Sequence, residues 1–577
     1  MKKLLFYLKG YKKESILAPL FKCLEALFEL FVPLAVAQII DVGMAENGGD
    51  KKTVFLMCGV LIALGIIGLV CAICAQFFAA KAAVGVSEKL RSSLFSHIQS
   101  FSYSMTDKIG TSTLITRMSS DVNSVQTGIN MFLRLFMRSP FIVFGAMIMA
   151  FVISPISLPV FAIVIAVLAA VVFTIILVGI PLYKTVQSRL DSVTGSVREN
   201  IGGVRVIRAF NRENAEIDDF KQRNNKHTDI QNFTGKIAAL MNPLTYVTVN
   251  LGIVAVLYLS SAEINAGNMT QGDLFAVYNY ISQILIELIK LANTVFTITK
   301  AVACANRVQS VLDTPAGMKV ASSDGVVDVD APAVEFCNVG LTYGEGGAPS
   351  LENITFRAEK GSTVGIIGGT GCGKTSLVNL IPRFYDASEG EVRVFGKNVN
   401  EYDLRDLREN IGIVPQKAIL FKGTVRSNLL WGNPAATDDE LWAALDLAQA
   451  SDFVKDKDGG LDATVEQFGR NFSGGQRQRL TIARAIVRRA PIIILDDSAS
   501  AIDFATEAKL RHALKGLDYD PTVFIVSQRT SSISHSDMIV VLDGGEIVGV
   551  GTHSELLDGC DVYREIYDSQ FKGGDAQ

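Results

Sequence analysis

Uncharged apolar stretches of membrane-spanning length fill the first half of the chain. Residues 54–80 and 237–262 contain no charged side chain, and residues 139–183 are also uncharged, with a Ser-Pro-Ile-Ser break in their middle. At about 1.5 Å per residue, the last stretch can cross a hydrocarbon core about 30 Å thick twice, so it predicts a tight helical hairpin. With residues 15–40 and 274–299, which carry a few charges, the pattern predicts six transmembrane helices.

The connections between these stretches alternate between short and long. The short connections hold only two basic residues, Lys51 and Lys52, whereas the long connections, about 81–130 and 184–236, are rich in Lys and Arg. Positive residues mark the cytoplasmic side of a membrane protein. Both termini and both long connections are therefore predicted to be cytoplasmic, and the long connections are predicted to be helical extensions of the spans.

From about residue 320 onward the pattern changes to that of a soluble α/β protein. Short apolar runs at 363–367, 492–495 and 523–526 alternate with helical patterns and glycine turns. The predicted organisation is an N-terminal cytoplasmic segment at 1–14, a six-helix membrane domain at 15–310, a linker at 311–330 and an α/β domain at 331–577.

Composition narrows the possible function classes. The chain has 577 residues, a mean hydropathy of +0.31, a net charge of −4 and a pI near 5.9. It therefore lacks the strongly basic footprint of a nucleic-acid-binding protein. The eight cysteines have no paired spacing, and the close pair Cys71 and Cys74 lies in an apolar run, so we expect neither a disulfide framework nor a metal site there. The apolar stretch after the basic N-terminus is too long for a signal peptide, so we expect the N-terminus to be retained.

A phosphate-binding loop follows the apolar run at 363–367. Residues 368–375 fit the pattern G-x-x-x-x-G-K-[ST], between a predicted strand and a predicted helix that begins at Lys374. Glycines let backbone N–H groups wrap the phosphates, the lysine meets the charge of the β and γ phosphates, and the hydroxyl of Thr375 binds Mg²⁺. The predicted ATP-binding residues of this loop are Gly368, Gly369, Thr370, Gly371, Cys372, Gly373, Lys374, Thr375 and Ser376.

Two further motifs accompany the loop. The apolar run at 492–495 ends in the carboxylate of Asp496, as expected for the group that holds the Mg²⁺ shell. Residues 471–479 read Asn-Phe-Ser-Gly-Gly-Gln-Arg-Gln-Arg and open a predicted helix. The set resembles the ATP-binding cassette (ABC) family, whose signature is Ser-Gly-Gly-Gln at a helix start upstream of that strand. The signature residues here are Ser473, Gly474, Gly475 and Gln476.

The resemblance covers the whole chain. A polytopic α-helical membrane domain followed by an α/β P-loop ATP-binding cassette is the layout of an exporter-type half-transporter. It implies that Tyr343 stacks on adenine, that Gln416 reaches Mg²⁺ and the attacking water, and that the loop at 500–503 touches the opposite subunit. It also implies that the turns near Ile109 and Phe210 dock on the cassettes as coupling helices. From the residues alone, each turn is also compatible with an ordinary amphipathic cytoplasmic helix, and Tyr343 is also compatible with a core or surface position.

Two positions depart from the family pattern. The family places a glutamate after Asp496 as general base, and this chain has Asp497, which is one methylene shorter. Where the family has a histidine that contacts the γ-phosphate, this chain has Gln528, whose neutral amide cannot carry the positive charge of an imidazolium. We therefore expect this chain's own site to bind ATP and to hydrolyse it poorly, while its intact signature completes a competent site in a different subunit.

Ionisable residues also lie within or near the predicted spans. Such groups are costly in lipid and face a bundle interior or a wet cavity. Helical spacing groups Lys22, Glu25 and Glu29 on the first span, Arg134 and Arg138 near the third, and Glu287 and Lys290 on the sixth. For these residues, a role in substrate contact and a role in structural ion pairs both remain open. The two arginines are also compatible with a position at the cytoplasmic edge of the membrane. The candidates for a substrate cavity are Lys22, Glu25, Glu29, Glu287 and Lys290.

The sequence thus predicts a subunit of an ATP-driven exporter in a bacterial plasma membrane, with ATP and Mg²⁺ as cofactors. The expected cargo is a drug or another amphiphilic small molecule. The expected partners are membrane lipid and a homologous half-transporter with an intact catalytic site, and no nucleic acid. Two alternatives stay open: a homodimeric transporter or lipid flippase that works slowly with Asp497 as base, and an ATP-regulated channel rather than a pump.

Overall fold

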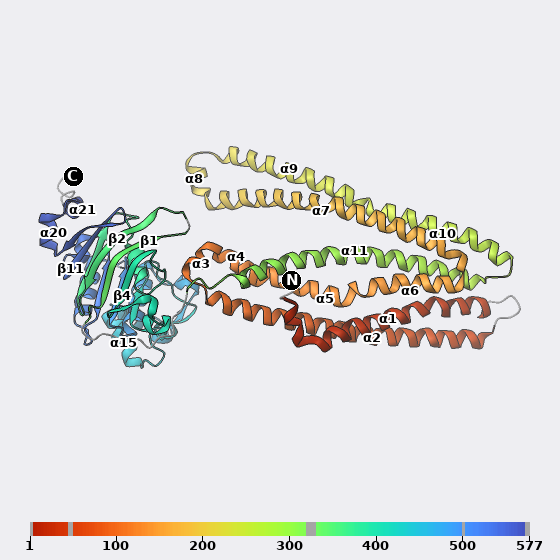
Figure 1. Cartoon of the computed structure of the whole chain (residues 1–577), viewed down its shortest axis with the longest axis horizontal. Helices are drawn as coiled ribbons and strands as arrows, with labels where there is room; N and C mark the ends of the chain where they lie inside the picture. The colour runs from red at the N-terminus through yellow and green to blue at the C-terminus, as the bar shows by residue number, and fades with distance from the viewer. Residues whose placement is uncertain (1–3, 44–49, 319–330, 345, 499–501, 572–577) are drawn as a thin grey trace. The chain divides into compact units, whose positions relative to one another are not determined.

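The computed structural model of the chain divides into two compact units (Figure 1). The described residues are 4–43, 50–318, 331–344, 346–498 and 502–571. The first unit comprises Met1–Gln99 and Ser112–Thr314, and the second comprises Ser100–Thr111 and Pro315–Gln577. The short segment Ser100–Thr111 therefore belongs to the second unit, although helices of the first unit flank it in sequence. Most of the predicted linker, at 319–330, and the polar tail at 572–577 lie outside the described residues.

Long helices make up the first unit. Six helical segments of the described chain are long and apolar enough to cross a membrane by length and composition, which confirms the predicted six spans. The main helices of this unit are α1 (Lys12–Gln38), α2 (Lys51–Gln99), α4 (Thr111–Thr116), α5 (Val122–Met131), α6 (Arg138–Ile153), α7 (Leu158–Gly202), α8 (Val204–Ala209), α9 (Glu213–Ala239), α10 (Met241–Asn265) and α11 (Gln271–Asp313). The short helix η1 (Leu4–Tyr11) precedes α1, and π-helical turns join α4, α5 and α6.

The predicted hairpin turns at Ser154. The helix α6 ends at Ile153, Ser154 is extended, and Pro155 begins the next turn, where its missing N–H removes no helical hydrogen bond. The Oγ of Ser157 donates to the carbonyl of Ser154 at 2.6 Å, and both serines are buried. This closed turn reverses the chain from α6 into α7.

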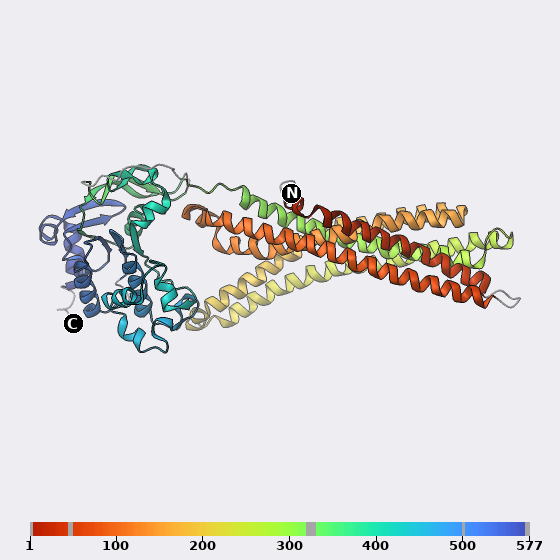
Figure 2. The ribbon, with the colours of Figure 1, turned by 90° about the horizontal axis from the view of Figure 1, so that it is seen from below.

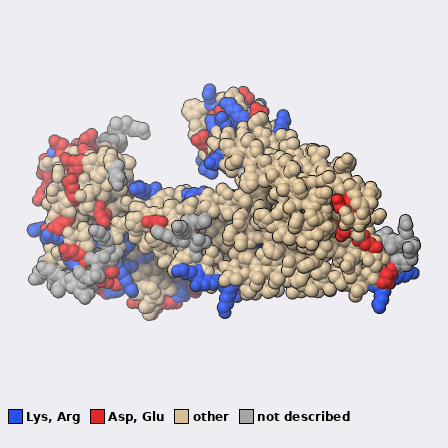
Figure 3. Space-filling view, turned by 45° about the vertical axis from the view of Figure 1, so that its right-hand side comes forward, with Lys and Arg blue, Asp and Glu red and all other residues tan. Residues whose placement is uncertain are grey.

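Small residues allow the first helices to approach each other closely. Ala18 on α1 and Ala79 and Ala82 on α2 are fully buried in one apolar cluster, as is usual where transmembrane helices pack on small side chains. A second link joins α1 to α11, because the Oη of the buried Tyr280 donates to the carbonyl of Leu30 at 2.7 Å. On the face shown in Figure 3, the middle of this unit is a broad area without Lys, Arg, Asp or Glu.

The helices α7 and α9 form a paired extension that ends in α8. In both ribbon views their ends near α8 diverge from the other helices of this unit (Figures 1 and 2). The six residues of α8 include none that is buried, and Phe210, which follows α8, is 73% exposed. Other residues of this unit therefore leave most of the apolar side chain of Phe210 uncovered.

The second unit is built on two principal sheets. The four-stranded sheet has the order β2-β1-β4-β5, and the six-stranded sheet has the order β12-β11-β3-β10-β9-β6. Adjacent strands of the six-stranded sheet are parallel, except that β12 pairs with β11 in the antiparallel direction. Their bounds are β1 (Val334–Thr342), β2 (Pro349–Ala358), β3 (Thr363–Gly368), β4 (Glu389–Val394), β5 (Lys397–Asn398), β6 (Ile411–Val414), β9 (Ile492–Asp496), β10 (Thr522–Val526), β11 (Met538–Asp543) and β12 (Glu546–Gly551).

The central strands explain why the sequence shows short, uninterrupted apolar runs. All five residues of β9 and all five of β10 are buried, as in a parallel sheet covered on both faces. Helices of this unit that matter for the site are α3 (Tyr103–Ile109), α12 (Lys374–Leu380), α15 (Asp438–Leu447), α17 (Gly474–Val487), α18 (Phe504–Lys515), α19 (Thr530–Ile533) and α21 (Asp561–Phe571). Because β3, β10 and β9 are neighbours, their carboxyl ends meet at one edge, where open α/β sheets bind ligands.

Candidate nucleotide-binding site

The phosphate loop follows β3 and leads into α12. Gly371 and Gly373 adopt positive φ angles of 84° and 97°, a region that side-chain-bearing residues rarely occupy. A Cβ on Gly373 would also lie 2.7 Å from the carbonyl oxygen of Ser350. The glycines are therefore required by the backbone, and the loop leaves the first N–H groups of α12 available to an anion.

Lys374 closes over this loop. Its Nζ donates to the carbonyls of Gly368 at 2.9 Å and Gly369 at 2.6 Å, and the residue is buried. The ammonium group thus lies above the centre of the loop, where phosphate oxygens of a nucleotide would compete with these carbonyls for its three protons. This position fits the role expected from the sequence.

The residues expected around Mg²⁺ come together at the end of β9. The Oγ1 of Thr375 donates to Oδ1 of Asp496 at 3.0 Å, although the two residues are 121 positions apart. Burial raises the pKa of Asp496, while the hydrogen bond from Thr375 opposes that shift. A hydroxyl beside a buried carboxylate is an oxygen donor set suited to Mg²⁺, so Thr375 and Asp496, with Gln416 nearby, would hold the ion. When bound, Mg²⁺ would neutralise charge on the nucleotide phosphates.

Asp497 and Gln416 are in direct contact. Asp497 has a φ of 47°, and its N–H donates to the carbonyl of Val526 at 3.0 Å, which ties it to the end of β10. The Nε2 of Gln416 donates to Oδ2 of Asp497 at 3.3 Å. Two residues singled out by the family pattern are therefore adjacent in space, which their separation of 81 positions does not reveal.

Gln528 is exposed and follows β10. Its backbone carbonyl accepts a hydrogen bond of 2.8 Å from Nε2 of Gln570 on α21, and Oε1 of Gln570 accepts from the N–H of Thr530 at 2.9 Å. The last described helix thus anchors the backbone on both sides of Arg529. Sequence reasoning missed this brace, because a glutamine near the chain end carries no motif.

Tyr343 lies beside the phosphate loop. Its Oη donates to the Oγ of Ser376 at 2.9 Å, and its ring meets the ring of Tyr385 edge-on at 5.0 Å. The side chain is 43% exposed, so part of the ring remains accessible. The expected stacking on adenine stays a prediction.

The signature forms the beginning of α17. Ser473 and Gln476 make a reciprocal capping box, in which the N–H of Gln476 donates to the Oγ of Ser473 at 3.3 Å. Ser473 and Gly474 are exposed, and Phe472, which stands where the family usually has leucine, is buried in the core. The start of α17 is exposed and is the positive end of the helix dipole. An anion from outside this unit can therefore approach it and is attracted to it.

Thr375, Gln416 and Asp496 line a cavity of about 690 Å³. Its described lining includes no signature residue. The helix α3 closes one side of it: the ring of Tyr103 stacks on Phe384 at 4.5 Å, and Asp107 accepts a hydrogen bond of 2.7 Å from the Oη of Tyr385. Burial, and secondly Asp107, raises the pKa of Tyr385. The turn near Ile109 is thus part of this unit, and its aromatic partners at 384–385 were missed from the sequence.

The loop at 500–503 is only partly described. Residues 499–501, and with them Ser500 and Ala501 of the expected contact loop, lie outside the described residues. Asp503 caps α18, because its Oδ1 accepts from the N–H of Thr506 at 3.0 Å.

In the first unit, the ionisable residues of the spans form pairs. Lys22 pairs with Glu25, and Lys290 pairs with Glu287 at 2.9 Å, as their spacing suggests. The two arginines near the third span do not share one environment. Arg134 bonds Gln76 on α2, whereas Arg138 is buried and pairs with Glu29 on α1 and with Glu287 on α11 at 3.2 Å. Arg138 is therefore the link between three helices, and its expected position at the cytoplasmic edge of the membrane stays a prediction.

Comparisons with known proteins agree with this architecture. Residues 15–288 match the family described as the ABC transporter transmembrane region, and residues 351–500 match the family described as ABC transporter. An uncharacterized ABC transporter ATP-binding protein of Mycobacterium tuberculosis is 36% identical over 572 residues, covering 98% of this chain and 97% of the relative. An ATP-dependent lipid A-core flippase of Hahella chejuensis is 30% identical over 578 residues, covering 100% of this chain and 97% of the relative.

The fold has a solved counterpart. The structure of a bacterial Atm1-family ABC exporter with ATP bound superimposes with a TM-score of 0.80 at 23% identity, covering 98% of each chain. Half-transporters of this kind act as dimers and couple ATP hydrolysis to transport. The chain belongs to the ABC transporter family, as a half-transporter with a six-helix membrane domain of exporter fold and one ATP-binding domain.

Proposed function

We propose that this chain is the weak-site subunit of a heterodimeric exporter. The observation that carries the proposal is the identity of the two residues at the catalytic edge: Asp497 stands where the family has glutamate, and Gln528 where it has histidine. The Ser-Gly-Gly-Gln signature at the start of α17 is complete, and its Ser473 and Gly474 are exposed, which supports a role in the ATP site of another subunit.

The chemistry of the two substitutions supports a slow site. A general base contributes typically about 10²–10⁴ to a rate, and its carboxylate must reach the proton it removes. Asp497 is shorter than glutamate by one methylene, and its Oδ2 is engaged by the amide of Gln416 at 3.3 Å. Gln528 can donate a hydrogen bond to a γ-phosphate but adds no positive charge. We expect ATP binding to be retained, because it depends mainly on the loop and Lys374.

The cargo we propose is an amphiphilic small molecule, such as a drug, moved outward across a bacterial plasma membrane, with both termini in the cytoplasm. The charged residues of the spans refine the candidate contacts. The side chains of Lys22 and Glu287 are only 10% and 5% exposed and are held in ion pairs, which favours a structural role. Glu29 and Lys290 are also in ion pairs, but their side chains are 42% and 45% exposed, so they are the better candidates for substrate contact.

The test compares two substitutions in purified complexes, with and without a co-expressed partner half-transporter. Ser473→Ala should nearly abolish steady-state ATPase activity, whereas Asp497→Asn should change it modestly. Since Ser473→Ala also removes a helix cap, Thr437→Ala, which removes the equivalent capping box of α15, is the matched control and should leave turnover near that of the unchanged complex. Full activity of this chain alone, together with collapse on Asp497→Asn, would refute the heterodimer.

A homodimeric lipid flippase is the second candidate, favoured by the relative of Hahella chejuensis, which is named as a lipid A-core flippase. In that case every site would contain Asp497, and both substitutions would be severe. Translocation of a fluorescent lipid in proteoliposomes that contain this chain alone, and that stops when Lys374 is replaced, would select this alternative.

A further inference from the structure

The short connection from β10 to α19 carries Gln528. The strand β10 lies between β3, which leads into the phosphate loop, and β9, which ends in Asp496, so this connection leaves the sheet at the edge of the ATP site. The N–H of Ser527 donates to the carbonyl of Ile366 in β3 at 3.0 Å, whereas the side chain of Gln528 is exposed. The direction of that side chain therefore depends on how the next peptide units are held.

The peptide unit between Gln528 and Arg529 is hydrogen-bonded at both ends. Its N–H donates to the Oγ of Ser527 at 3.0 Å. Its carbonyl accepts from the Nε2 of Gln570 on α21 at 2.8 Å, across 42 positions of sequence. A side chain from the last described helix thus fixes the orientation of this peptide unit, and with it the backbone of Gln528.

The next peptide unit, between Arg529 and Thr530, has the same partner. The N–H of Thr530 donates to Oε1 of Gln570 at 2.9 Å, and the Oγ1 of the fully buried Thr530 donates to the same oxygen at 3.0 Å. The carbonyl of Arg529 accepts from the N–H of Ser532 at 3.2 Å. One amide side chain therefore holds one group of each peptide unit that flanks the α-carbon of Arg529.

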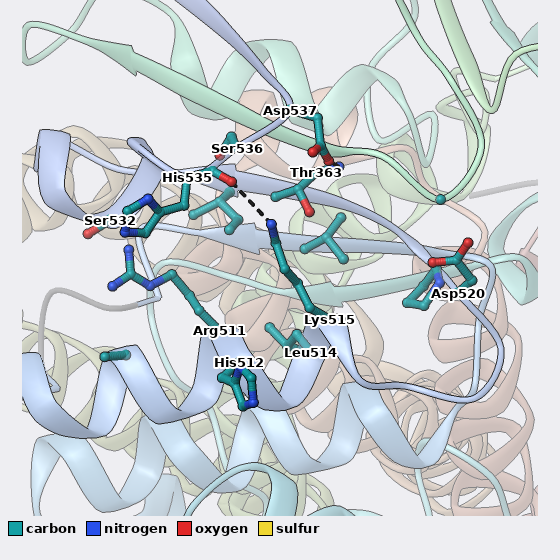
Figure 4. Close-up of a pocket in the computed structure, with 15 residues that line it drawn as sticks. Thr363, Arg511, His512, Leu514, Lys515, Asp520, Ser532, His535, Ser536 and Asp537 are labelled. Atoms are coloured by element: carbon teal, nitrogen blue, oxygen red, sulfur yellow. Dashed lines mark hydrogen bonds between the residues drawn. The ribbon is translucent and has the colours of Figure 1, made fainter. Parts of the chain in front are cut away.

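The helix α18 holds a different part of the chain after β10. Figure 4 shows Arg511 and Lys515 extending from α18, beside a cavity of about 690 Å³, toward the segment around Ser532 and His535. Arg511 donates to the carbonyl of Ser531, and the Nζ of Lys515 donates to the carbonyl of His535 at 3.3 Å. Both bonds act on α19 and the residues after it, so they do not replace the bonds that Gln570 makes to residues 528–530.

The helix α21 is anchored independently of Gln570. Tyr563 is fully buried, and its Oη lies 2.6 Å from Nδ1 of His553. The Nε of Arg564 donates to the carbonyl of Leu557 at 2.7 Å. Gln570 is exposed and lies near the other end of the helix. A substitution of Gln570 should therefore leave α21 packed and remove only its bonds to residues 528–530.

We propose that Gln570 is a positioning residue of the ATP site, which holds Gln528 where its amide donates to the γ-phosphate. The inference rests on the proposed function, from which it takes the contact between Gln528 and the γ-phosphate. A neutral amide binds phosphate through a directed hydrogen bond, so its contribution depends on its orientation. ADP has no γ-phosphate. Gln570 therefore contributes to the preference of this chain's site for ATP over ADP.

The test uses the full-length protein in nanodiscs and two probes, the non-hydrolysable analogue AMP-PNP and ADP, each with Mg²⁺. Their affinities are measured by displacement of a photoreactive ATP analogue from this subunit. Gln570→Ala should weaken AMP-PNP binding about threefold to tenfold, the equivalent of one hydrogen bond, and leave ADP binding unchanged, which also serves as the folding control. Ser569→Ala is the matched control, because the Oγ of Ser569 donates to the carbonyl of Ile566 in the same helix, and it should change neither affinity.

The substitution Gln528→Ala shows whether the effect of Gln570 passes through Gln528. It should weaken AMP-PNP binding without changing ADP binding, and adding Gln570→Ala should bring no further loss, because the group to be positioned is gone. If Gln528→Ala leaves the preference for AMP-PNP unchanged, the γ-phosphate contact taken from the proposed function is wrong, and the role of Gln570 falls with it.

Three other results would overturn the role of Gln570 alone, with the γ-phosphate contact of Gln528 intact. One is a loss of preference for AMP-PNP in Gln528→Ala but not in Gln570→Ala. Another is an equal weakening of AMP-PNP and ADP by Gln570→Ala, which would make Gln570 structural. The third is a full additional loss when Gln570→Ala is combined with Gln528→Ala, since the two residues would then act independently.

Discussion

Arg138 is the residue of the membrane unit whose loss should be most informative. Its side chain is 9% exposed and it bonds Glu29 on α1 and Glu287 on α11, so replacing it with methionine leaves Glu287, at 5% exposure, without its cationic partner on another helix. Removing one partner of a buried ion pair costs about 3–5 kcal/mol in soluble proteins.

The expected cost in this chain is smaller. Glu287 keeps Lys290 at 2.9 Å and the hydroxyl of Ser139 at 3.0 Å, so its charge is partly compensated. The unfolded chain in a membrane also finds alternative partners, which lowers measured values. We therefore expect Arg138→Met to lower the free energy of unfolding by about 2 kcal/mol.

The assay is reversible unfolding in mixed micelles by increasing mole fractions of sodium dodecyl sulfate. The control is Lys221→Met, because Lys221 and Asp218 form an ion pair with side chains 66% and 70% exposed, which should contribute less than about 1 kcal/mol. Adding Glu287→Met to Arg138→Met should cost less than the sum of the two single changes. Additive effects, or a loss for Arg138→Met no larger than for Lys221→Met, would refute the three-helix link.

The remaining predictions concern the ATP-binding unit. Lys374→Ala should weaken ATP binding at this chain's own loop at least about tenfold, because the ammonium over the loop is lost, and undiminished labelling of this subunit by a photoreactive ATP analogue would contradict it. Tyr343→Ala should weaken binding of ATP but not of tripolyphosphate, since the ring is expected to stack on adenine, and equal losses would make Tyr343 structural. Tyr385→Phe removes the hydrogen bond to Asp107 and should weaken docking of α3 by about 1 kcal/mol, so transport should fall more than ATPase activity, while a strictly proportional fall would show that coupling lies elsewhere.

The motifs of the ATP site could be predicted because they depend on local backbone geometry. Gly373 has a positive φ and no room for a Cβ, so the loop requires glycine at this position. The sequence motif shows that glycine directly. Ser473 and Gln476 cap the same helix start, and their spacing of three residues is the spacing of a capping box. Uncharged stretches of about twenty residues likewise follow from the thickness of a bilayer.

The partners of the charged residues could not be predicted in the same way. Helical spacing correctly pairs Lys22 with Glu25, because residues three positions apart share a face. It gives no information on which helix lies opposite, so the link from Arg138 to Glu29, across 109 positions, came only from the packed bundle. The stacking of Tyr103 on Phe384 is another contact between distant segments, and neither residue belongs to a motif.

The sequence by itself therefore determined the spans, the phosphate loop, the signature and the two positions that depart from the family pattern, because each is encoded in a short segment with its own spacing. Only the tertiary structure decided which other segments each of them contacts. The order of β3, β10, β9 and β6 in the sheet brings Thr375 to Asp496 and Gln416 to Asp497. The same sheet separates the ATP site from the cavity lined by α18 and residues 532–537. Strand order and helix packing depend on the fit of many buried side chains at once. A local sequence pattern carries no information about that fit.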